Sequence, residues 1–367
     1  MTLSVSVFFA MCFTTIVLSF CRRSFTFPSL LTKVHFIWYC SYNMYLLLII
    51  FLLLCTNSNA LAKPSSSKRL RTLYTTPRKY NSPAILLPGI HDALSAKEYA
   101  RSGAEVLFLS GFGVSATLGL PDLGLLTLTE MERSLRYVVL AAGDVPVIVD
   151  GDTGYGGEVN IRRTVRSFAA AGAAAVTIED QVFPKKCAYA AGEGVLVVPR
   201  DECLKRIQAA LRAGDEARDL DGNDIIIIAR TDCRAALGLE EAIERCKMFE
   251  EAGADICYAE NLQSREEYEK LRNNLKPSTG TILAQVQTGE KDQTLFSRQD
   301  IGNMKYDFGL FGISALQSYV HSLQKCATAM MIDHHASGLI DTNHEGVTLA
   351  QFDNVKESAG FSDYESF

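Results

Sequence analysis

Apolar and polar residues form a repeating unit along the chain from residue 81 onward. Each unit contains an apolar run of strand length, a polar or glycine-rich turn, and a segment with helical periodicity. Over residues 158–171, for example, Ile161, Val165 and Phe168 follow the spacing of one buried helix stripe. The apolar runs predict eight strands, over residues 84–87, 105–110, 145–150, 174–179, 224–229, 255–260, 281–285 and 307–313.

Turn residues support the same division into units. Gly103, Gly172 and Gly253 each follow a predicted helix and precede a predicted strand, as left-handed glycine does at helix ends. Ser264 and Glu267 have the spacing of a capping box at a helix start. Apolar strands that alternate with helices pair in parallel, so eight units predict an α/β fold, a (β/α)8 barrel of the TIM type. An open doubly wound sheet fits less well, because the sequence has no glycine-rich phosphate-binding motif.

Polar residues come directly after most of the predicted strands. The sequence there reads Ser110-Gly111-Phe112, Asp150-Gly151-Asp152, Glu179-Asp180, Arg230-Thr231-Asp232, Glu260-Asn261 and Gln285-Val286-Gln287. In a (β/α)8 barrel the carboxyl ends of the strands carry the active site. This concentration of polar groups therefore predicts an active site rather than a set of solvated turns.

The acidic residues at these strand ends require a counter-charge. Asp150, Asp152 and Glu179 would repel one another in a pocket of low dielectric constant unless a cation neutralised them. Arg230 supplies one positive charge, on a planar group that suits a carboxylate or a phosphonate. A hard divalent cation such as Mg²⁺, which binds one or two carboxylates and keeps water in its other positions, is expected to supply the rest. A network of salt bridges without a metal is the alternative.

The segment from residue 181 to 198 is long for a connection between compact units. It contains Pro184-Lys185-Lys186-Cys187, and two glycines, Gly192 and Gly194, allow it to hinge as a lid. Lysines beside a thiol lower its pKa. Cys187 is therefore a candidate proton donor or nucleophile, with a chance surface cysteine as the alternative.

Charge divides the chain unevenly. All 42 acidic residues lie from Asp92 onward, so the folded part is acidic and a poor candidate for binding nucleic acid. The N-terminal segment has an apolar run at 46–55, a site at 58–60 that resembles a signal-peptidase site, and a basic, acid-free stretch at 61–80. Residues 1–80 are expected to be a removable targeting presequence, with translation starting at Met1 or Met44.

This presequence predicts an organelle, with the plastid favoured over mitochondrial import or secretion. After its removal we expect no stable role at a membrane. The catalytic barrel is expected over residues 81–325, and a helical tail used in assembly over residues 326–367.

Four segments together resemble one enzyme superfamily. They are SGFGVSATLGLPD (110–122), VDGDTGYGG (149–157), IEDQVFPKKC (178–187) and ARTD (229–232). These motifs are similar to those of the isocitrate lyase and phosphoenolpyruvate mutase superfamily, over about residues 83–325. The chain most resembles the short members, which include methylisocitrate lyase, 2,3-dimethylmalate lyase and carboxyvinyl-carboxyphosphonate phosphorylmutase.

The resemblance implies roles for the matching residues. It implies that Asp150 binds Mg²⁺ directly, with Mn²⁺ as a substitute, and that three further acids hold the metal's water molecules: Asp122, Asp152 and Glu179. The residues expected to contact the substrate are Ser110, Gly111, Phe112, Arg230 and Glu260. Cys187 matches the cysteine of the lyase motif KKCGH. The resemblance also implies a last helix that swaps between the subunits of a homotetramer.

Two departures from the lyase pattern narrow the range of expected substrates. The motif KKCGH reads KKCAY here, so Tyr189 stands where the lyases have histidine. After the seventh strand, N-x-T-E-F-G is replaced by Gln285-Val286-Gln287-Thr288-Gly289-Glu290. The resemblance implies that the missing groups help to bind the extra carboxylate of a tricarboxylate, so a smaller acid is expected.

These features predict a Mg²⁺-dependent carbon–carbon lyase that cleaves a malate-type 2-hydroxy dicarboxylate into a 2-oxo acid and a carboxylate. Arg230, Glu179 and Cys187 are the candidate catalytic residues. Cys187 would protonate the enediolate fragment, and Glu179 or Tyr155 would act as the base. The alternatives are a mutase or hydrolase acting on phosphoenolpyruvate or a phosphonate, hydrolysis or decarboxylation of oxaloacetate, and a barrel kept as a non-catalytic binding module.

Overall fold

The structure, a computed structural model, describes residues 65–76, 82–189, 194–289, 293, 295–331, 350 and 352–359. Its strands are β1 (Ile85–Ile90), β2 (Leu107–Leu109), β3 (Val147–Asp150), β4 (Ala175–Ile178), β5 (Ile226–Thr231), β6 (Ile256–Ala259), β7 (Gly280–Gln285) and β8 (Phe308–Phe311). Its helices are α3 (Ser66–Thr75), α4 (Ala93–Arg101), α5 (Gly111–Thr117), α6 (Leu128–Ala142), α7 (Glu158–Ala170), α8 (Arg200–Asp221), α9 (Arg234–Leu237), α10 (Leu239–Ala252), α11 (Arg265–Asn273), α12 (Arg298–Asn303), α13 (Ser314–Met331) and α14 (Phe352–Ala359).

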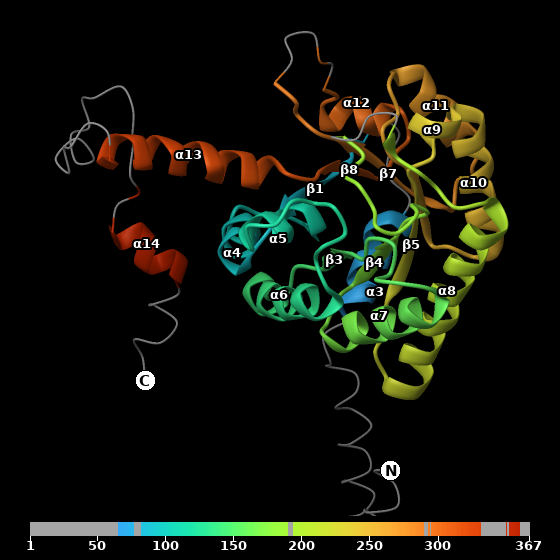
Figure 1. Cartoon of the computed structure of the whole chain (residues 1–367), viewed down its shortest axis with the longest axis horizontal. Coiled ribbons are helices and arrows are strands. Elements are labelled where there is room, and N and C mark those ends of the chain that lie inside the picture. The colour runs from blue at the N-terminus through green and yellow to red at the C-terminus, as the bar shows by residue number, and fades with distance from the viewer. Residues whose placement is uncertain are drawn as a thin grey trace, which may run out of the picture. The chain divides into compact units, whose positions relative to one another are not determined.

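The eight strands form a closed parallel barrel. Each strand pairs with the next in chain order, and β8 pairs with β1 through Ile85 and Phe308 (Figure 1). Every strand expected from the sequence is present, with its ends shifted by a few residues. The predicted (β/α)8 architecture is therefore confirmed.

Apolar side chains form two layers, one inside the barrel and one between the strands and the helices. On β3, Ile148 belongs to the inner layer, whereas Val147 and Val149 pack against the helices. This alternation follows from the period of two along a strand. Parallel strands buried on both faces explain why the strands read as continuous apolar runs.

Helix ends follow the sequence signals, with one exception. Gly103, Gly172 and Gly253 follow α4, α7 and α10 with φ angles of 88°, 94° and 100°, in the region that glycine adopts without strain. Ser264 caps α11 by accepting a bond from the Glu267 amide at 3.4 Å. The Glu267 carboxylate accepts from the amide of Gln263 instead of Ser264, so only half of the predicted capping box forms.

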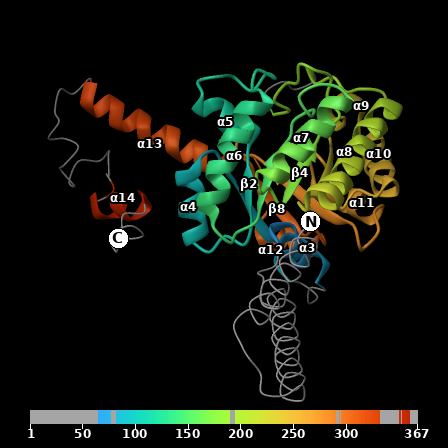
Figure 2. The ribbon, with the colours of Figure 1, turned by 90° about the horizontal axis from the view of Figure 1, so that it is seen from below.

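Helix α3 belongs to the barrel although the sequence analysis placed it in the presequence. Leu70 is fully buried in the apolar layer inside the barrel, and the ring of Tyr74 lies 6.3 Å from that of Phe308. Figure 2 shows α3 at the end of the barrel opposite α5. The boundary expected after residue 80 therefore moves to the N-terminal side of α3, because the compact unit that contains the barrel begins at Pro64.

Helix α13 crosses the boundary that was expected after residue 325. Leu316, near its start, is buried, whereas Tyr319, Leu323 and Met331 are 49%, 49% and 73% exposed. Helix α14 lies in the expected tail. The apolar run at 46–55 and the cleavage site at 58–60 lie outside the described residues. None of the helices in the described ranges is both long and apolar enough to span a membrane.

Candidate active site

The predicted site residues continue the inward-facing rows of the barrel strands. Because side chains alternate along a strand, Asp150 faces the same way as Ile148, which lies inside the barrel. The same spacing places Ser110 after Phe108, Glu179 after Ala175, Arg230 after Ile228 and Glu260 after Tyr258. The apolar interior of the barrel thus ends in a layer of polar groups.

A cavity of about 240 Å³ lies at these strand ends. Seven of the predicted site residues line it, namely Ser110, Phe112, Asp122, Asp150, Cys187, Arg230 and Glu260. The other three contact residues of the lining: Gly111 bonds to Asp150, Asp152 to Lys185, and Glu179 to Arg230. Ala284, Val286, Leu310 and Ile313 form an apolar part of the wall. The cavity therefore suits a small acid with an apolar portion.

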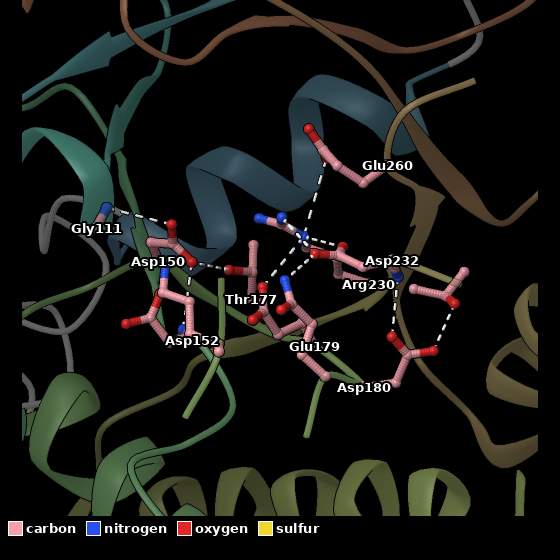
Figure 3. A network of polar contacts seen from close by, with 12 residues as sticks. Gly111, Asp150, Asp152, Thr177, Glu179, Asp180, Arg230, Asp232 and Glu260 are labelled. Carbon is pink, nitrogen blue, oxygen red and sulfur yellow. Dashed lines mark hydrogen bonds and ion pairs between the residues drawn. The ribbon is translucent and has the colours of Figure 1, made fainter. Parts of the chain in front are cut away.

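Three donors hold the Asp150 carboxylate at the end of β3. Its Oδ2 accepts from the Gly111 amide at 3.2 Å, and its Oδ1 accepts from Thr177 Oγ1 at 3.1 Å and from the Asp152 amide at 3.3 Å (Figure 3). A Cβ atom on Gly111 would lie only 3.0 Å from Asp152 Oδ1, so glycine permits this close approach. The Gly111 amide, expected to bind the substrate carboxylate, instead donates to Asp150.

A buried lysine neutralises two of the acids. The Lys185 ammonium lies 2.5 Å from Asp122 Oδ1 and 2.8 Å from Asp152 Oδ1. Its side chain is only 6% exposed. The sequence predicts this charge beside Cys187, where it would lower the pKa of the thiol, but in the structure Lys185 pairs with the two carboxylates. Part of the expected counter-charge thus comes from the chain itself.

Burial shifts the proton affinity of two carboxyl groups. It raises the pKa of Asp152 to about 6, against the opposing charge of Lys185. It also raises the pKa of Glu179 well above its usual value, although Arg230 opposes the shift. Among the described residues, Glu179 Oε1 has no hydrogen-bond partner. This oxygen is therefore available to accept a proton.

The donor set suits a hard cation that keeps most of its water. Within the described ranges, no three acidic, histidine or cysteine side chains lie close enough to enclose a metal ion. Mg²⁺ needs no such enclosure, because it typically binds one or two carboxylates and retains several waters. Asp150, with the unpartnered oxygen of Glu179 and the nearby Asp152 and Asp122, fits this mode of binding.

Two carboxylates orient Arg230. Its Nε lies 2.6 Å from Asp232 Oδ1 and 3.3 Å from Glu179 Oε2, and its Nη2 donates to Asp232 Oδ2 at 2.9 Å (Figure 3). Glu260 Oε2 lies farther away, 3.9 Å from Nε. These contacts within the described structure engage Nε and Nη2, so Nη1 is the group best placed to bind a substrate carboxylate.

The loop after β4 brings Cys187 and Tyr189 to the cavity. Cys187 is partly exposed. The Tyr189 hydroxyl is buried, and burial together with the charge of Glu260 raises its pKa well above the usual value. Tyr189 therefore keeps its proton at neutral pH and can donate a hydrogen bond. The predicted hinge residue Gly192 lies outside the described residues.

Tyr155, the other candidate base, is less suited to that role. Its hydroxyl is buried, and burial with the neighbouring negative charges, of which Asp152 is the strongest, raises its pKa well above the usual value. A base must lose its proton before it can accept one. Glu179 is the better candidate.

Four residues with a clear place in the site were not assigned from the sequence: Thr177, Gln181, Lys185 and Asp232. A signal existed for Asp232, which lies two residues after Arg230 and therefore shares its face of β5. Thr177 and Lys185 have partners on other strands or loops, and so does Gln181 in its bond to Asp232. No local pattern in the sequence reveals such contacts.

Comparison with known proteins identifies the family. The family model for phosphoenolpyruvate phosphomutase matches residues 78–329. The chain is 34% identical over 292 residues to 2,3-dimethylmalate lyase of Eubacterium barkeri, covering 79% of this chain and 94% of the relative. It is 41% identical over 228 residues to the petal death protein of Dianthus caryophyllus, covering 62% and 67%.

Solved structures agree with this result. A crystal structure of 2,3-dimethylmalate lyase matches with a TM-score of 0.72 at 29% identity, over 82% of this chain and 94% of the other. A structure of oxaloacetate acetylhydrolase matches with a TM-score of 0.70 at 29% identity, over 82% and 94%. The chain belongs to the phosphoenolpyruvate phosphomutase family, within the phosphoenolpyruvate mutase and isocitrate lyase superfamily of enzymes.

Proposed function

We propose that this protein is a Mg²⁺-dependent lyase that cleaves a carbon–carbon bond of a malate-type 2-hydroxy dicarboxylate. The observation that carries the proposal is the shared cavity, which Asp150, Arg230 and Cys187 all line. The names of two relatives, 2,3-dimethylmalate lyase and 2-methylisocitrate lyase, support the same reaction class.

The cavity has groups that suit the carboxylate, the hydroxyl group and the alkyl substituents of such a substrate. Arg230 would bind a carboxylate through its guanidinium, and Ser110 and Phe112 would flank it. The apolar wall formed by Ala284, Val286, Leu310 and Ile313 suits alkyl substituents. Mg²⁺ held at Asp150 would supply the charge that acidifies the 2-hydroxyl group and stabilises its oxyanion.

The proposed reaction transfers one proton in each direction. Glu179 accepts the proton of the 2-hydroxyl group, and the oxygen electron pair forms the carbonyl of the 2-oxo acid product. The C2–C3 bond breaks, and its electron pair remains on the second fragment as an enediolate. Cys187 gives its proton to that carbon, which completes the carboxylate product. Tyr189, which lines the cavity, would help to exclude water from it.

Hydrolysis of oxaloacetate is the second candidate, favoured by the match to oxaloacetate acetylhydrolase. Its substrate is also a small dicarboxylate, but a water molecule must attack the carbonyl carbon. Phosphorus–carbon chemistry, suggested by the name of the family model, is the third. The thiol beside the cavity favours the lyase reaction, because cleavage leaves a carbanion that needs a proton.

A substrate panel tests the proposal. The panel contains alkyl-substituted malates, methylisocitrate, oxaloacetate and phosphonopyruvate, each with Mg²⁺ and with excess chelator. We expect turnover of an alkyl malate that depends on Mg²⁺. Turnover of oxaloacetate or the phosphonate alone, or full activity in chelator, would overturn the proposal.

We also propose that α13 packs on another copy of the chain in a homotetramer. A groove on the outer face of the barrel is lined by Leu86, Pro88 and Phe311, and Leu86 is 39% exposed. α13 carries exposed Tyr319 and Leu323. Light scattering should show a tetramer for the parent and a smaller species for Leu323→Asp. An unchanged mass would exclude this use of α13.

For localisation, we propose that the segment before α3 directs the protein to an organelle, with the plastid favoured. The relative from Arabidopsis thaliana that is named chloroplastic supports this proposal. Residues 1–63 fused to a fluorescent reporter should deliver it to an organelle. Fluorescence that fills the cytosol would exclude this role.

A further inference from the structure

Gln181 lies at the base of the loop that carries Cys187, directly after the acids at the end of β4. The residue is buried, with 1% of its surface exposed. Its backbone pairs with Val197, which brings the two ends of the loop together, and its carbonyl accepts from Arg206 Nη1 at 2.7 Å. These two contacts hold the backbone of Gln181 independently of the contacts of its side chain.

The side-chain amide of Gln181 holds the residue beside the thiol. Its Oε1 accepts from the Lys186 amide at 2.9 Å, and its Nε2 donates to the Lys186 carbonyl at 2.9 Å. Both polar atoms of one backbone residue are therefore bound by one side chain. This requires a donor and an acceptor at the same distance from the backbone, which only a primary amide of this length provides.

The same Nε2 atom also donates to Asp232 Oδ2 at 2.5 Å. Asp232 is the carboxylate that accepts two bonds from Arg230, and its own amide donates to Asp180 at 2.9 Å (Figure 3). Asp232 is buried with 1% of its surface exposed. A shift of its carboxylate would therefore move the guanidinium of Arg230, because Asp232 accepts from both Nε and Nη2, whereas Glu179 contacts Nε.

We propose that Gln181 is a positioning residue that holds Cys187 and Arg230 in a fixed relation by binding Lys186 and Asp232 with one amide. This inference rests on the proposed function, in which the thiol donates a proton and the guanidinium binds a carboxylate. Movement of the loop and rotation of the guanidinium are then coupled. An anion bound at Arg230 therefore stabilises the position of the loop in which Cys187 lies at the cavity. Conversely, that loop position strengthens the binding of the anion.

The alternative is that Gln181 only anchors the loop, and Arg206→Met provides the matched control. Arg206 binds the Gln181 carbonyl and Glu202, so its removal loosens the base of the loop without removing a contact to Asp232. Gln181→Met keeps the length of the side chain and removes the amide. Comparison of Gln181→Met with Arg206→Met therefore distinguishes anchoring of the loop from positioning of Arg230.

Two measurements on the Mg²⁺-loaded protein decide between these roles. The first is the affinity for oxalate, a small dicarboxylate, by calorimetry. The second is the rate at which iodoacetamide labels Cys187, followed by peptide mass spectrometry. Gln181→Met should weaken oxalate binding by roughly 10-fold and change the labelling rate, because the bonds to Lys186 and to Asp232 are both lost. Arg206→Met should change the labelling rate with oxalate affinity within about twofold of the parent.

Asp232→Asn, which keeps the shape of the side chain, tests the same coupling at its Arg230 side. It should change the labelling rate at Cys187, because it weakens the bond from Gln181 Nε2 and with it the hold of Gln181 on Lys186. Parent-like oxalate affinity in Gln181→Met, or parent-like labelling in Asp232→Asn, overturns the proposal. Neither measurement uses turnover. Failure of the proposed lyase activity in the substrate panel can therefore be distinguished from failure of the proposed role of Gln181.

Discussion

Lys185 and Asp152 form an ion pair inside the active site, with 2.8 Å between the lysine Nζ and the carboxylate Oδ1. The same ammonium lies 2.5 Å from Asp122, whose side chain is 7% exposed. A buried ion pair adds little stability relative to apolar side chains, but removal of one partner leaves an uncompensated charge. The two carboxylates therefore depend on Lys185 whenever no divalent cation is bound.

Replacing Lys185 with Met should destabilise the metal-free protein. We expect the free energy of unfolding in urea with excess chelator to fall by about 3–5 kcal/mol. Mg²⁺ should restore part of this loss, because a cation that binds only the native state stabilises it. Lys186→Met is the control, since Lys186 is exposed and adjacent, and it should change the stability by less than about 0.5 kcal/mol. Equal losses in the two variants would show that the buried pair has no special role.

Replacing Asp150 with Ala should abolish activity and preserve the fold. The variant loses the proposed direct ligand, and it also relieves repulsion among the remaining acids. Binding of Mn²⁺, followed by electron paramagnetic resonance, should weaken in step with activity, while the circular dichroism spectrum stays unchanged. Asp215→Ala, at an exposed acid of α8, should leave both properties at the parent level. Parent-like Mn²⁺ binding in Asp150→Ala would move the metal site elsewhere.

The sequence was sufficient for the barrel because its strands carry a strong local signal. Runs such as residues 145–150 are apolar on both faces, and glycines such as Gly172 mark the helix ends. Helix α3 was missed for the opposite reason. Its residues are basic and rich in Ser and Thr, and the burial of Leu70 depends on the open end of a barrel that the local sequence does not describe.

The site was predictable where each residue lies at the carboxyl end of its own predicted strand. Asp150, Glu179 and Arg230 could be placed from strand order and the period of two. The pairing of Lys185 with Asp122 joins two loops that are far apart in the sequence, and the bond between Gln181 and Asp232 joins the segments that follow β4 and β5. These contacts follow from the three-dimensional closure of the barrel, so periodicity cannot reveal them.

Truncation should separate the presequence from the barrel. A protein that begins at residue 64 should fold and be active, because it keeps α3 and removes only the unit before it. A protein that begins at residue 81 should be strongly destabilised, because the inner apolar layer loses Leu70 and Tyr74. Thermal unfolding and turnover of the two proteins provide the comparison. Equal stability would mean that α3 is dispensable.

A point substitution checks the cause of that loss. Leu70→Ala in the longer protein should cost about 2–5 kcal/mol, the usual effect of truncating a fully buried leucine. Leu73→Ala, at a partly buried position of the same helix, should cost less. If neither substitution matters, the barrel end is not stabilised by α3 in the way proposed.

The final prediction concerns the proton donor, for which Cys187 and Tyr189 compete. If Cys187 is the donor, Cys187→Ser should lower kcat by roughly 10² to 10⁴, the usual worth of a positioned general acid. Substrate affinity should change little, because Arg230 and the acids near Asp150 remain in place. Thiol alkylation should inactivate the enzyme, and a bound substrate analogue that covers the cavity should protect it.

Tyr189→Phe is the matched variant, because it removes a hydroxyl that lines the same cavity and keeps its proton at neutral pH. If Tyr189 only helps to bind substrate and exclude water, this change should raise KM more than it lowers kcat. A serine hydroxyl has nearly the size of the thiol but is a far weaker acid, so a large loss of kcat in Cys187→Ser alone reports proton transfer. The reverse pattern, with kcat lost only in Tyr189→Phe, would assign the proton to Tyr189 and leave the metal and arginine assignments standing.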